Sequence, residues 1–188
     1  MNKLLIVGAG GHGKCCLDIA RDMKQFQRID FLDDNRVGEV INECKVIGTI
    51  GDISTYYPEY TNIFIAVGNN KLREELSIKA KNIGYTLVSL ISSDAYISRY
   101  AVIGNGSVIF PKAVVEANAK IGKECILGSS TVINHDASIE DYVLINTGSI
   151  IRPEVSIGSL TSIGCNCVIS FGSQVEMKSI IDDYSHIK

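Results

Sequence analysis

An apolar residue recurs at every sixth position through the C-terminal half of the chain, and this period restricts the possible folds more than any other feature. From Ile97 to Ile187 the position holds Ile, Val or Leu sixteen times without a slip. A helix requires apolar residues at a period near 3.6, and a half-buried strand requires a period of 2. A period of six therefore predicts that each hexad forms one short strand and one turn.

Three such hexads would close one triangular coil of eighteen residues, and sixteen hexads make about five stacked coils. Stacked coils pair their backbones at about 4.8 Å, as neighbouring strands do. The recurring apolar residue is expected to fill the interior of this prism, and the small residue two places before it leaves room. We expect glycines at the corners, where a positive φ is needed; they are Gly104, Gly122, Gly128, Gly158 and Gly164.

Residues 1–92 follow a different pattern, in which apolar strand-like runs alternate with amphipathic helices. This alternation predicts a small Rossmann-like α/β domain with a parallel sheet. The predicted fold is an N-terminal α/β domain over residues 1–92 followed by a parallel β-helix over residues 93–188. Within the first domain we expect strands over residues 3–7, 29–34, 62–67 and 86–91, and helices over residues 14–24 and 71–82.

Charge and cysteine content narrow the range of partners and compartments. The net charge is −3 and both halves carry both signs, which is not typical of a surface that binds nucleic acid or membrane. No secretory signal is visible, and no apolar run reaches the ~18 residues of a membrane span. The cysteines lack zinc-site spacing, so we expect reduced thiols, no metal and a cytoplasmic protein. Three of them are expected in interior-leaning positions, which disfavours a cysteine nucleophile: Cys125, Cys165 and Cys167.

A glycine-rich turn lies at the start of the chain. Gly8, Gly10 and Gly13 follow a predicted strand and open a predicted helix, and Asp33 and Asp34 come about twenty residues later, after the next strand. This spacing matches the dinucleotide-binding fingerprint. The α/β half has only about 90 residues, however, which is too short for the two mononucleotide halves of an NAD site. In the alternative interpretation the glycines serve packing alone and the aspartates only end a strand.

The whole chain resembles bacterial sugar acetyltransferases that join a small nucleotide-binding-like domain to a hexapeptide-repeat β-helix. These include the bacillosamine-pathway and perosamine N-acetyltransferases and the sialic acid O-acetyltransferases. The resemblance implies a left-handed β-helix and acetyl-CoA as co-substrate. It also implies a homotrimer, in which a neighbouring subunit covers an outward corner of the prism. The stretches that carry it are Gly8–Gly13, Phe31–Asp34, Phe64–Asn70 and Ser130–Asp136.

The resemblance implies that the N-terminal domain holds a nucleotide-sugar acceptor rather than a dinucleotide. His12 would then lie in the glycine turn, within reach of the phosphate or sugar of the acceptor, and Asp33 and Asp34 would contact the same substrate. Gly68 and Asn69 follow a strand and are expected to line this crevice. The alternative for Asn69 is an ordinary helix cap.

His135 is the predicted catalytic residue. It lies two positions after the interior Ile133, which points it outward near a corner. Acetyl transfer from a thioester needs a base that takes the proton of the acceptor, and an imidazole suits that task at neutral pH. The resemblance assigns Asp136 to orient the imidazole, and Glu140 or Asp141 would compete for that role. In the alternative interpretation His135 is an exposed loop residue without a role.

Two features depart from the family pattern. The residue eighteen positions after the catalytic histidine commonly presents a backbone N–H to the thioester oxygen, but here it is Pro153, which has none. The donor is then expected from Glu154 or a neighbouring coil. Relatives also end in a tail that helps to hold coenzyme A, whereas this sequence stops at Lys188. We expect either a cap on the last coil or a truncated chain. The pantetheine groove is expected along the backbone of Ile163, Gly164 and Gly172.

Three functions remain open. The prediction is direct N-acetylation of a nucleotide-linked amino sugar by acetyl-CoA, with His135 as general base. One alternative is O-acetylation of sialic acid or another sugar hydroxyl. The other, kept open by Pro153 and by the end of the sequence, is a non-catalytic protein that binds a nucleotide sugar.

Overall fold

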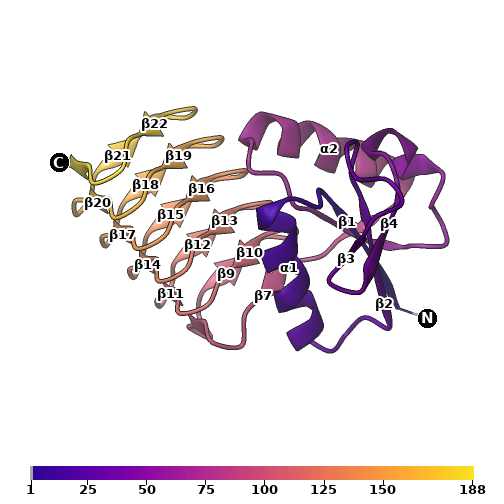
Figure 1. Ribbon diagram of the computed structural model, residues 1–188. Helices are drawn as coiled ribbons and strands as arrows, with labels where there is room; N and C mark the ends of the chain where they lie inside the picture. Colours follow the sequence, from indigo (N-terminus) through magenta and orange to yellow (C-terminus); the bar gives the residue numbers. More distant parts are fainter. Residues whose placement is uncertain (1) are drawn as a thin grey trace. The chain divides into compact units, whose positions relative to one another are not determined.

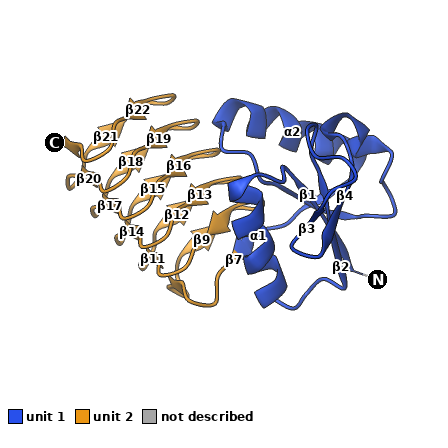
Figure 2. Cartoon of the chain, viewed as in Figure 1, with its two compact units in different colours: residues 1–90 blue, residues 91–188 orange. Residues whose placement is uncertain are grey.

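A computed structural model describes residues 2–188, and the chain divides into two compact units (Figures 1 and 2). The first unit spans Met1–Leu90 and the second spans Ile91–Lys188. The first is an α/β unit and the second is a stack of short parallel strands, so the predicted fold class is confirmed. Within residues 2–188, no helix is both long and apolar enough to cross a bilayer.

The α/β unit is built on one sheet with the strand order β3-β4-β2-β1-β5-β6. Strand β3 runs antiparallel to β4, and the other pairs are parallel. In the central strand β1, the four residues from Leu4 to Val7 are all buried, as in parallel sheets that are covered on both faces. The elements are β1 (Lys3–Val7), α1 (Gly11–Asp22), β2 (Arg28–Leu32), β3 (Val40–Ile41), β4 (Cys44–Gly48), the 3₁₀ helix η1 (Ile50–Ser54), β5 (Asn62–Ile65), α2 (Asn70–Ile83) and β6 (Thr86–Leu87).

The two helices were predicted with different accuracy. Helix α2 begins and ends within one residue of the prediction, because Asn69 caps it through a bond from Leu72 N–H and Gly84 ends it with a φ of 117°. Helix α1 begins at Gly11, three residues before the predicted start. The second half of the glycine-rich segment, Gly11 to Gly13, therefore belongs to the first turn of α1.

The hairpin β3–β4 was not predicted from the sequence, and it adds two strands to one edge of the sheet. Its turn residues Asn42 and Glu43 both have positive φ, as a two-residue hairpin turn requires. The predicted strand over residues 86–91 was also wrong in part. It is two strands: β6 ends at Leu87, and β7 (Leu90–Ile91) pairs with β10 in the stacked-strand unit.

The second unit is a left-handed parallel β-helix with three faces. Strands on one face are eighteen residues apart, so that Val108 pairs with Ile126 and Ile126 pairs with Leu144. The first face holds β7, β10 (Val108–Ile109), β13 (Ile126–Leu127), β16 (Leu144–Ile145), β19 (Ser162–Ile163) and β22 (Ile180–Ile181). The second face holds β8 (Tyr96–Ile97), β11 (Val114–Val115), β14 (Val132–Ile133), β17 (Ile150–Ile151), β20 (Val168–Ile169) and β23 (His186–Ile187). The third face holds β9 (Val102–Ile103), β12 (Lys120–Ile121), β15 (Ser138–Ile139), β18 (Ser156–Ile157) and β21 (Gln174–Val175).

The interior of the β-helix is formed by the residues that recur every sixth position. In the central coils these side chains are fully buried, for example Ile133, Ile145 and Ile157. The small residue two places earlier is buried beside them, as at Ala137 and Thr131. The predicted core is confirmed, and its packing leaves the intervening side chains to point outward at the faces and corners.

The predicted role of the corner glycines was wrong. Positive φ occurs in the last residue of the hexads, at glycines such as Gly106 and Gly148 but also at Asn118 and Asp136. The predicted glycines stand two positions earlier and do not have positive φ. They are needed for space instead: a Cβ on Gly122 would lie 2.5 Å from the backbone carbon of Glu140 in the next coil. The same close approach to the next coil holds for Gly104, Gly128, Gly158 and Gly164.

Candidate active site

His135 lies on a corner of the β-helix where the chain turns from the second face to the third. We call residues 134–137 the His135 corner; it lies between β14 and β15. The imidazole is about half exposed, as predicted for an outward position. Its backbone N–H donates to Glu116 Oε2 at 2.9 Å, and Glu116 belongs to the coil before. The histidine is thus anchored through its backbone while its ring stays accessible.

Asp136 is bonded directly to the His135 ring. His135 Nδ1 lies 2.8 Å from Asp136 Oδ2, and Asn118 Nδ2 donates to Asp136 Oδ1 at 3.1 Å. These hydrogen bonds hold the pKa of the Asp136 carboxyl below its usual value, the bond from His135 contributing most. An ionised carboxylate only accepts, so Nδ1 donates to Asp136 in this pair. In the neutral ring, Nε2 is then the nitrogen that can accept a proton.

The two competing carboxylates lie elsewhere. Glu140 and Asp141 occupy the next corner, between β15 and β16. Glu140 Oε2 accepts from the N–H and the hydroxyl of Ser159 at 2.9 and 2.8 Å, and Asp141 Oδ1 accepts from Lys123 N–H at 2.8 Å. Each carboxylate therefore joins neighbouring coils, and the structure brings Asp136 to His135.

The backbone above His135 offers no outward N–H at the residue where the family commonly has one. Pro153 stands at this place in the next coil, and its carbonyl accepts from Gly172 N–H at 3.0 Å. The N–H of Glu154, the predicted substitute, points to the carbonyl oxygen of His135 at 3.4 Å. Glu154 N–H is therefore directed along the stack rather than outward, so it does not replace the missing donor in this arrangement.

The three residues predicted to line the pantetheine groove do not share one corner. Gly172 lies on the same edge of the prism as His135, two coils further along. Ile163 and Gly164 belong to the end of β19, where the chain turns from the first face to the second. The side chain of Ile163 is fully buried in the interior, so only its backbone is available to a ligand.

A second candidate site lies in the α/β unit at the carboxyl ends of β1 and β5. These strands are neighbours in the sheet, and the chain leaves β1 toward β2 on one side and β5 toward β6 on the other. A parallel sheet binds its ligands outside such a switch point. The predicted residues Gly8–Gly13 follow β1 and Gly68 and Asn69 follow β5, so both sets lie at this switch point.

The glycines of the first turn have different structural reasons. Gly8 has a φ of 102°, and a Cβ there would lie 2.7 Å from Ala66 O. A Cβ on Gly13 would lie 2.0 Å from Gly8 O, so only glycine lets α1 approach the end of β1 this closely. Gly10 is the N-cap of α1, and a Cβ there meets nothing within 4 Å. Two of the three glycines thus serve packing, as the alternative interpretation proposed.

The two aspartates hold the loops at this end of the sheet. Asp33 Oδ2 accepts from Ala9 N–H in the glycine turn at 2.9 Å, and Asp33 Oδ1 accepts from Asn35 N–H at 3.0 Å. Asp34 Oδ1 accepts from Ile50 N–H at 2.8 Å. Both side chains therefore have a structural task, and their contact with substrate stays a prediction.

His12 lies in the first turn of α1 and is kept neutral by its surroundings. Burial, and next the positive charge of Arg73, lower the pKa of His12 to about 4. Its Nε2 atom lies 3.7 Å from the Sγ atom of Cys16 one turn along the helix. At neutral pH the imidazole is thus uncharged, so it would meet a substrate without a positive charge.

The lowered pKa of His12 predicts how stability depends on pH. Between about pH 6.5 and 4 the unfolded chain binds a proton at His12 and the folded chain does not, so stability is lost as the pH falls through this window. The shift corresponds to roughly 3 kcal/mol at about 1.4 kcal/mol per pKa unit. Urea unfolding of the native protein and of His12→Gln at pH 7 and pH 4.5 measures this. We expect the free energy of unfolding to fall less between pH 7 and pH 4.5 in the variant than in the native protein. An equal fall in both proteins would contradict the lowered pKa of His12.

Sequence reasoning missed Arg73, a buried arginine in the first turn of α2. It is 1% exposed, and it donates to the carbonyls of Val67 and Gly68 and to the side chain of Asn70. An arginine in a helix that is otherwise rich in charged residues carries no signal of burial, so the sequence could not have revealed it. Asn69 caps α2, as its alternative interpretation stated.

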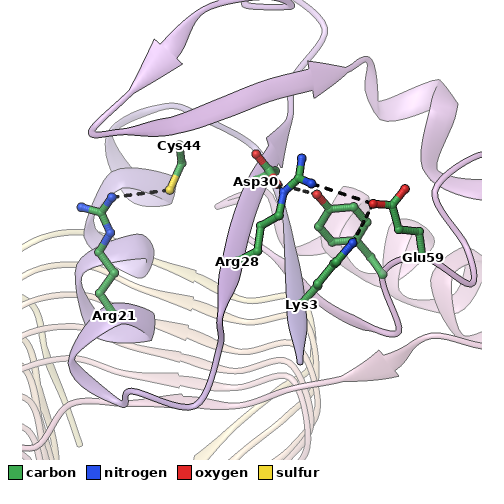
Figure 3. A network of polar contacts seen from close by, with 7 residues as sticks. Lys3, Arg21, Arg28, Asp30, Cys44 and Glu59 are labelled. Carbon is green, nitrogen blue, oxygen red and sulfur yellow. Dashed lines mark hydrogen bonds and ion pairs between the residues drawn. The ribbon is translucent and has the colours of Figure 1, made fainter. Parts of the chain in front are cut away.

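A network of polar contacts lies at the opposite end of the sheet (Figure 3). Asp30 is buried there and accepts from Arg28 and from the hydroxyl of Tyr60. Lys3 pairs with Glu59 beside it at 2.7 Å. A recess of about 550 Å³ opens next to this network. Both arginines that line it are engaged, because Arg28 binds Asp30 and Arg21 binds Glu43 and the carbonyl of Asn42, so we assign the network a structural role.

The cysteines are not bonded to one another, and one of them was misplaced by the sequence analysis. Cys125 and Cys167 are buried as predicted, but Cys165 is partly exposed, because it lies on a corner like His135. Within residues 2–188, no group of three or more His, Cys, Asp or Glu side chains is arranged to hold a metal ion.

Two family models together match almost the whole chain. Residues 3–80 match the PglD N-terminal domain, and residues 90–185 match the GMPPB C-terminal domain. Among curated proteins the chain is 33% identical over 117 residues to the uncharacterized protein L142 of Acanthamoeba polyphaga mimivirus. It is 30% identical over 112 residues to the UDP-N-acetylbacillosamine N-acetyltransferase of Bacillus subtilis (strain 168). The matches cover 62% and 58% of this chain, and 23% and 51% of those two proteins.

Solved structures match the full length of the chain. The acetyltransferase domain of PglB from Neisseria gonorrhoeae FA1090 is 32% identical, with a TM-score of 0.96, over 100% of this chain and 92% of that one. The same domain in complex with acetyl coenzyme A has a TM-score of 0.93, over 100% of this chain and 93% of that one. The fold is also that of a mutant perosamine N-acetyltransferase from Caulobacter crescentus, solved with CoA and GDP-perosamine, at 20% identity and a TM-score of 0.83 over 99% and 91% of the chains.

Proposed function

This chain belongs to the family of sugar acetyltransferases that includes the PglB acetyltransferase domain, and from that premise we propose that it transfers an acetyl group from acetyl-CoA to the amino group of a nucleotide-linked sugar. The observation that carries the proposal is the hydrogen-bonded pair of His135 and Asp136 on an outward corner of the β-helix. The chain is 32% identical over its whole length to a domain solved with acetyl coenzyme A, which supports the choice of acyl donor.

The proposed reaction is a direct transfer. The neutral amine of the sugar attacks the thioester carbonyl, a carbon–nitrogen bond forms, and the carbon–sulfur bond breaks. His135 Nε2 accepts the proton that the nitrogen loses, and the departing thiolate of coenzyme A takes up a proton to leave as the thiol. Asp136 keeps the imidazole in the tautomer that accepts at Nε2 and stabilises the imidazolium that forms.

The acceptor is proposed to bind at the crevice between the ends of β1 and β5. Backbone N–H groups at the start of α1, around Gly10 and Gly13, favour the negative charge of a nucleotide diphosphate. His12, as a neutral imidazole, would donate a hydrogen bond to a phosphate or sugar oxygen. The remaining proposed acceptor contacts are Gly8, Asp33, Asp34, Gly68 and Asn69.

Acetyl-CoA is proposed to lie along the β-helix next to His135. A shallow groove of about 220 Å³ runs over β15, β18 and β21 on the third face, beginning at Ser138, three residues after His135. Gly172 borders the same edge, but Ile163 and Gly164 lie on a different one. A channel that includes both edges needs a second copy of the chain beside the first. We propose that these copies form a homotrimer, as the resemblance implies, in which each subunit contributes one wall.

Two alternatives to N-acetylation remain. The same histidine–aspartate pair would serve a sugar hydroxyl, which is deprotonated during the attack, so O-acetylation of sialic acid or another sugar uses the same residues. A protein that binds nucleotide sugars without catalysis is favoured by one observation. Pro153 provides no N–H above His135, and Glu154 N–H is directed at the carbonyl of His135.

The test is turnover with a panel of acceptors. The protein is incubated with acetyl-CoA and amino sugars or hydroxyl sugars linked to UDP, GDP or CMP, and the release of free thiol is followed. We expect thiol release with at least one nucleotide-linked amino sugar and a product heavier by one acetyl group. Release with hydroxyl acceptors alone would replace N-acetylation by O-acetylation. Binding of a nucleotide sugar without any thiol release would support the non-catalytic alternative.

A further inference from the structure

Arg73 is an unusual residue for its place in the fold. It is the fourth residue of α2 and is fully buried, so its positive charge lies in the first turn of a helix. A cation is disfavoured there, because the N-terminal end of a helix already carries partial positive charge. Burial of a cation also carries a penalty unless hydrogen bonds compensate for the lost water. Local interactions must therefore offset both unfavourable contributions at Arg73.

The hydrogen bonds that Arg73 donates to the turn between β5 and α2 supply these interactions. Nη1 donates to Val67 O at 2.9 Å and to Gly68 O at 3.2 Å, and Nη2 donates to Asn70 Oδ1 at 2.8 Å. The planar guanidinium spans these acceptors at once, which a lysine ammonium cannot do with the same geometry. Arg73 thereby sets the path of the backbone from residue 67 to residue 70.

The charge of Arg73 also acts on the glycine turn. It is one of the two causes that lower the pKa of His12, which lies on α1 after β1. The glycine turn and the β5–α2 turn therefore share one electrostatic environment at the switch point of the sheet. A buried cation in a region of low dielectric constant attracts a nearby anion more strongly than an exposed cation does.

We propose that Arg73 is a positioning residue of the acceptor site: its guanidinium fixes the β5–α2 turn and supplies the positive field for the phosphates of the acceptor. Because it is buried, it acts through the turn and the field and not by touching the substrate. This inference rests on the proposed binding of a nucleotide-linked acceptor at the crevice. It names the residue on which the affinity for that acceptor depends.

The experiment compares Arg73→Lys and Arg73→Met with the native protein. We expect the KM for the nucleotide sugar to rise on the order of tenfold in Arg73→Met, because a charge-assisted set of hydrogen bonds is lost. The KM for acetyl-CoA and kcat at saturating acceptor stay within about twofold. Arg73→Lys keeps the positive charge but not the planar guanidinium that spans several acceptors, so we expect a smaller rise in the KM for the nucleotide sugar. In Arg73→Met the pKa of His12, followed by NMR, rises toward its ordinary value.

Arg28→Met provides a matched control. Arg28 also binds a buried partner, Asp30, but at the opposite end of the same sheet. We expect this variant to lower the melting temperature without changing the KM for the nucleotide sugar. An acceptor KM that rises equally in Arg28→Met and Arg73→Met would reduce Arg73 to a general stabiliser of the unit.

The inference and the proposed function fail in different ways. If folded Arg73→Met or Arg73→Lys binds the nucleotide sugar as tightly as the native protein, the inference is overturned even though acetyl transfer proceeds. If the native protein transfers no acetyl group, calorimetric titration with UDP-, GDP- and CMP-sugars still measures the loss of affinity in the variants. Absence of any binding by the native protein overturns both.

Discussion

Replacement of His135 by alanine is expected to lower kcat for acetyl transfer by about 10²- to 10⁴-fold, the usual contribution of a positioned general base. The KM for the nucleotide sugar should change little, because the proposed acceptor crevice is built from β1, α1, β5 and α2 in the α/β unit. Thiol release from acetyl-CoA under saturating conditions, together with calorimetric binding of the acceptor, measures both quantities.

The physical reason for so large an effect is the arrangement around the ring. Asp136 binds Nδ1 at 2.8 Å and is itself held by Asn118, so the imidazole is ready to accept a proton at Nε2 before the substrate arrives. Alanine removes the base that has this support. The half-exposed ring contributes little to packing, so the melting temperature of the variant should stay close to the native value.

His186→Ala is the matched control for this prediction. His186 is another exposed histidine of the β-helix, on β23, and its ring lies 3.0 Å from Ser170 Oγ, which is a hydroxyl rather than a carboxylate. We expect this variant to keep native kcat. A His135→Ala variant that retains more than about a tenth of native kcat would remove the general base from the mechanism.

Gly13→Ala is expected to be the most damaging small substitution in the α/β unit. The added methyl would lie 2.0 Å from Gly8 O and 2.9 Å from Gly8 C, and both are backbone atoms that no side-chain rotation can move away. Helix α1 would have to shift from the end of β1. Overpacking usually costs about 1–3 kcal/mol, and the backbone contact favours the upper end, so we expect a melting temperature lower by about 10 °C.

Gly11→Ala distinguishes this clash from a general effect of adding a methyl. A Cβ on Gly11 meets nothing within 4 Å, and the residue is the first of α1. Alanine there should keep or slightly raise the melting temperature, because it is a better helix former than glycine. Calorimetry of both variants measures the difference. Similar melting temperatures would mean that α1 and β1 are less tightly apposed than the structure has them.

The β-helix was predictable because one period encodes it. Each interior residue, such as Ile133 or Ile145, repeats the same local environment. A hexad with an ambiguous sequence can therefore be assigned from the hexads on either side of it. The backbone at the corners was less predictable. Positive φ recurs at the last residue of the hexad even where the side chain is Asp136 or Glu154, because the coil geometry overrides the preference of the residue. A glycine such as Gly122 is required by a close contact with the backbone of the next coil and not by a positive φ.

The candidate site was predictable only where it depends on local sequence. Asp136 follows His135 directly, so a contact between their side chains needs no knowledge of the fold. Arg73 is distant from His12 in the sequence, and its effect on that residue arises only when the sheet brings β1 and β5 together. For the same reason the hydrogen bond that Ala9 N–H donates to Asp33 was not visible in the sequence.

The constant step of eighteen residues between paired strands limits how this chain can change length. An insertion of eighteen residues after β18 would add one full layer and leave every earlier and later side chain pointing in its original direction. An insertion of two or three residues there would turn interior positions such as Ile163 and Ile169 toward solvent in every subsequent layer. Viable length variants are therefore expected to differ by whole layers, which would alter the distance from His135 to the far end of the stack without altering its immediate surroundings.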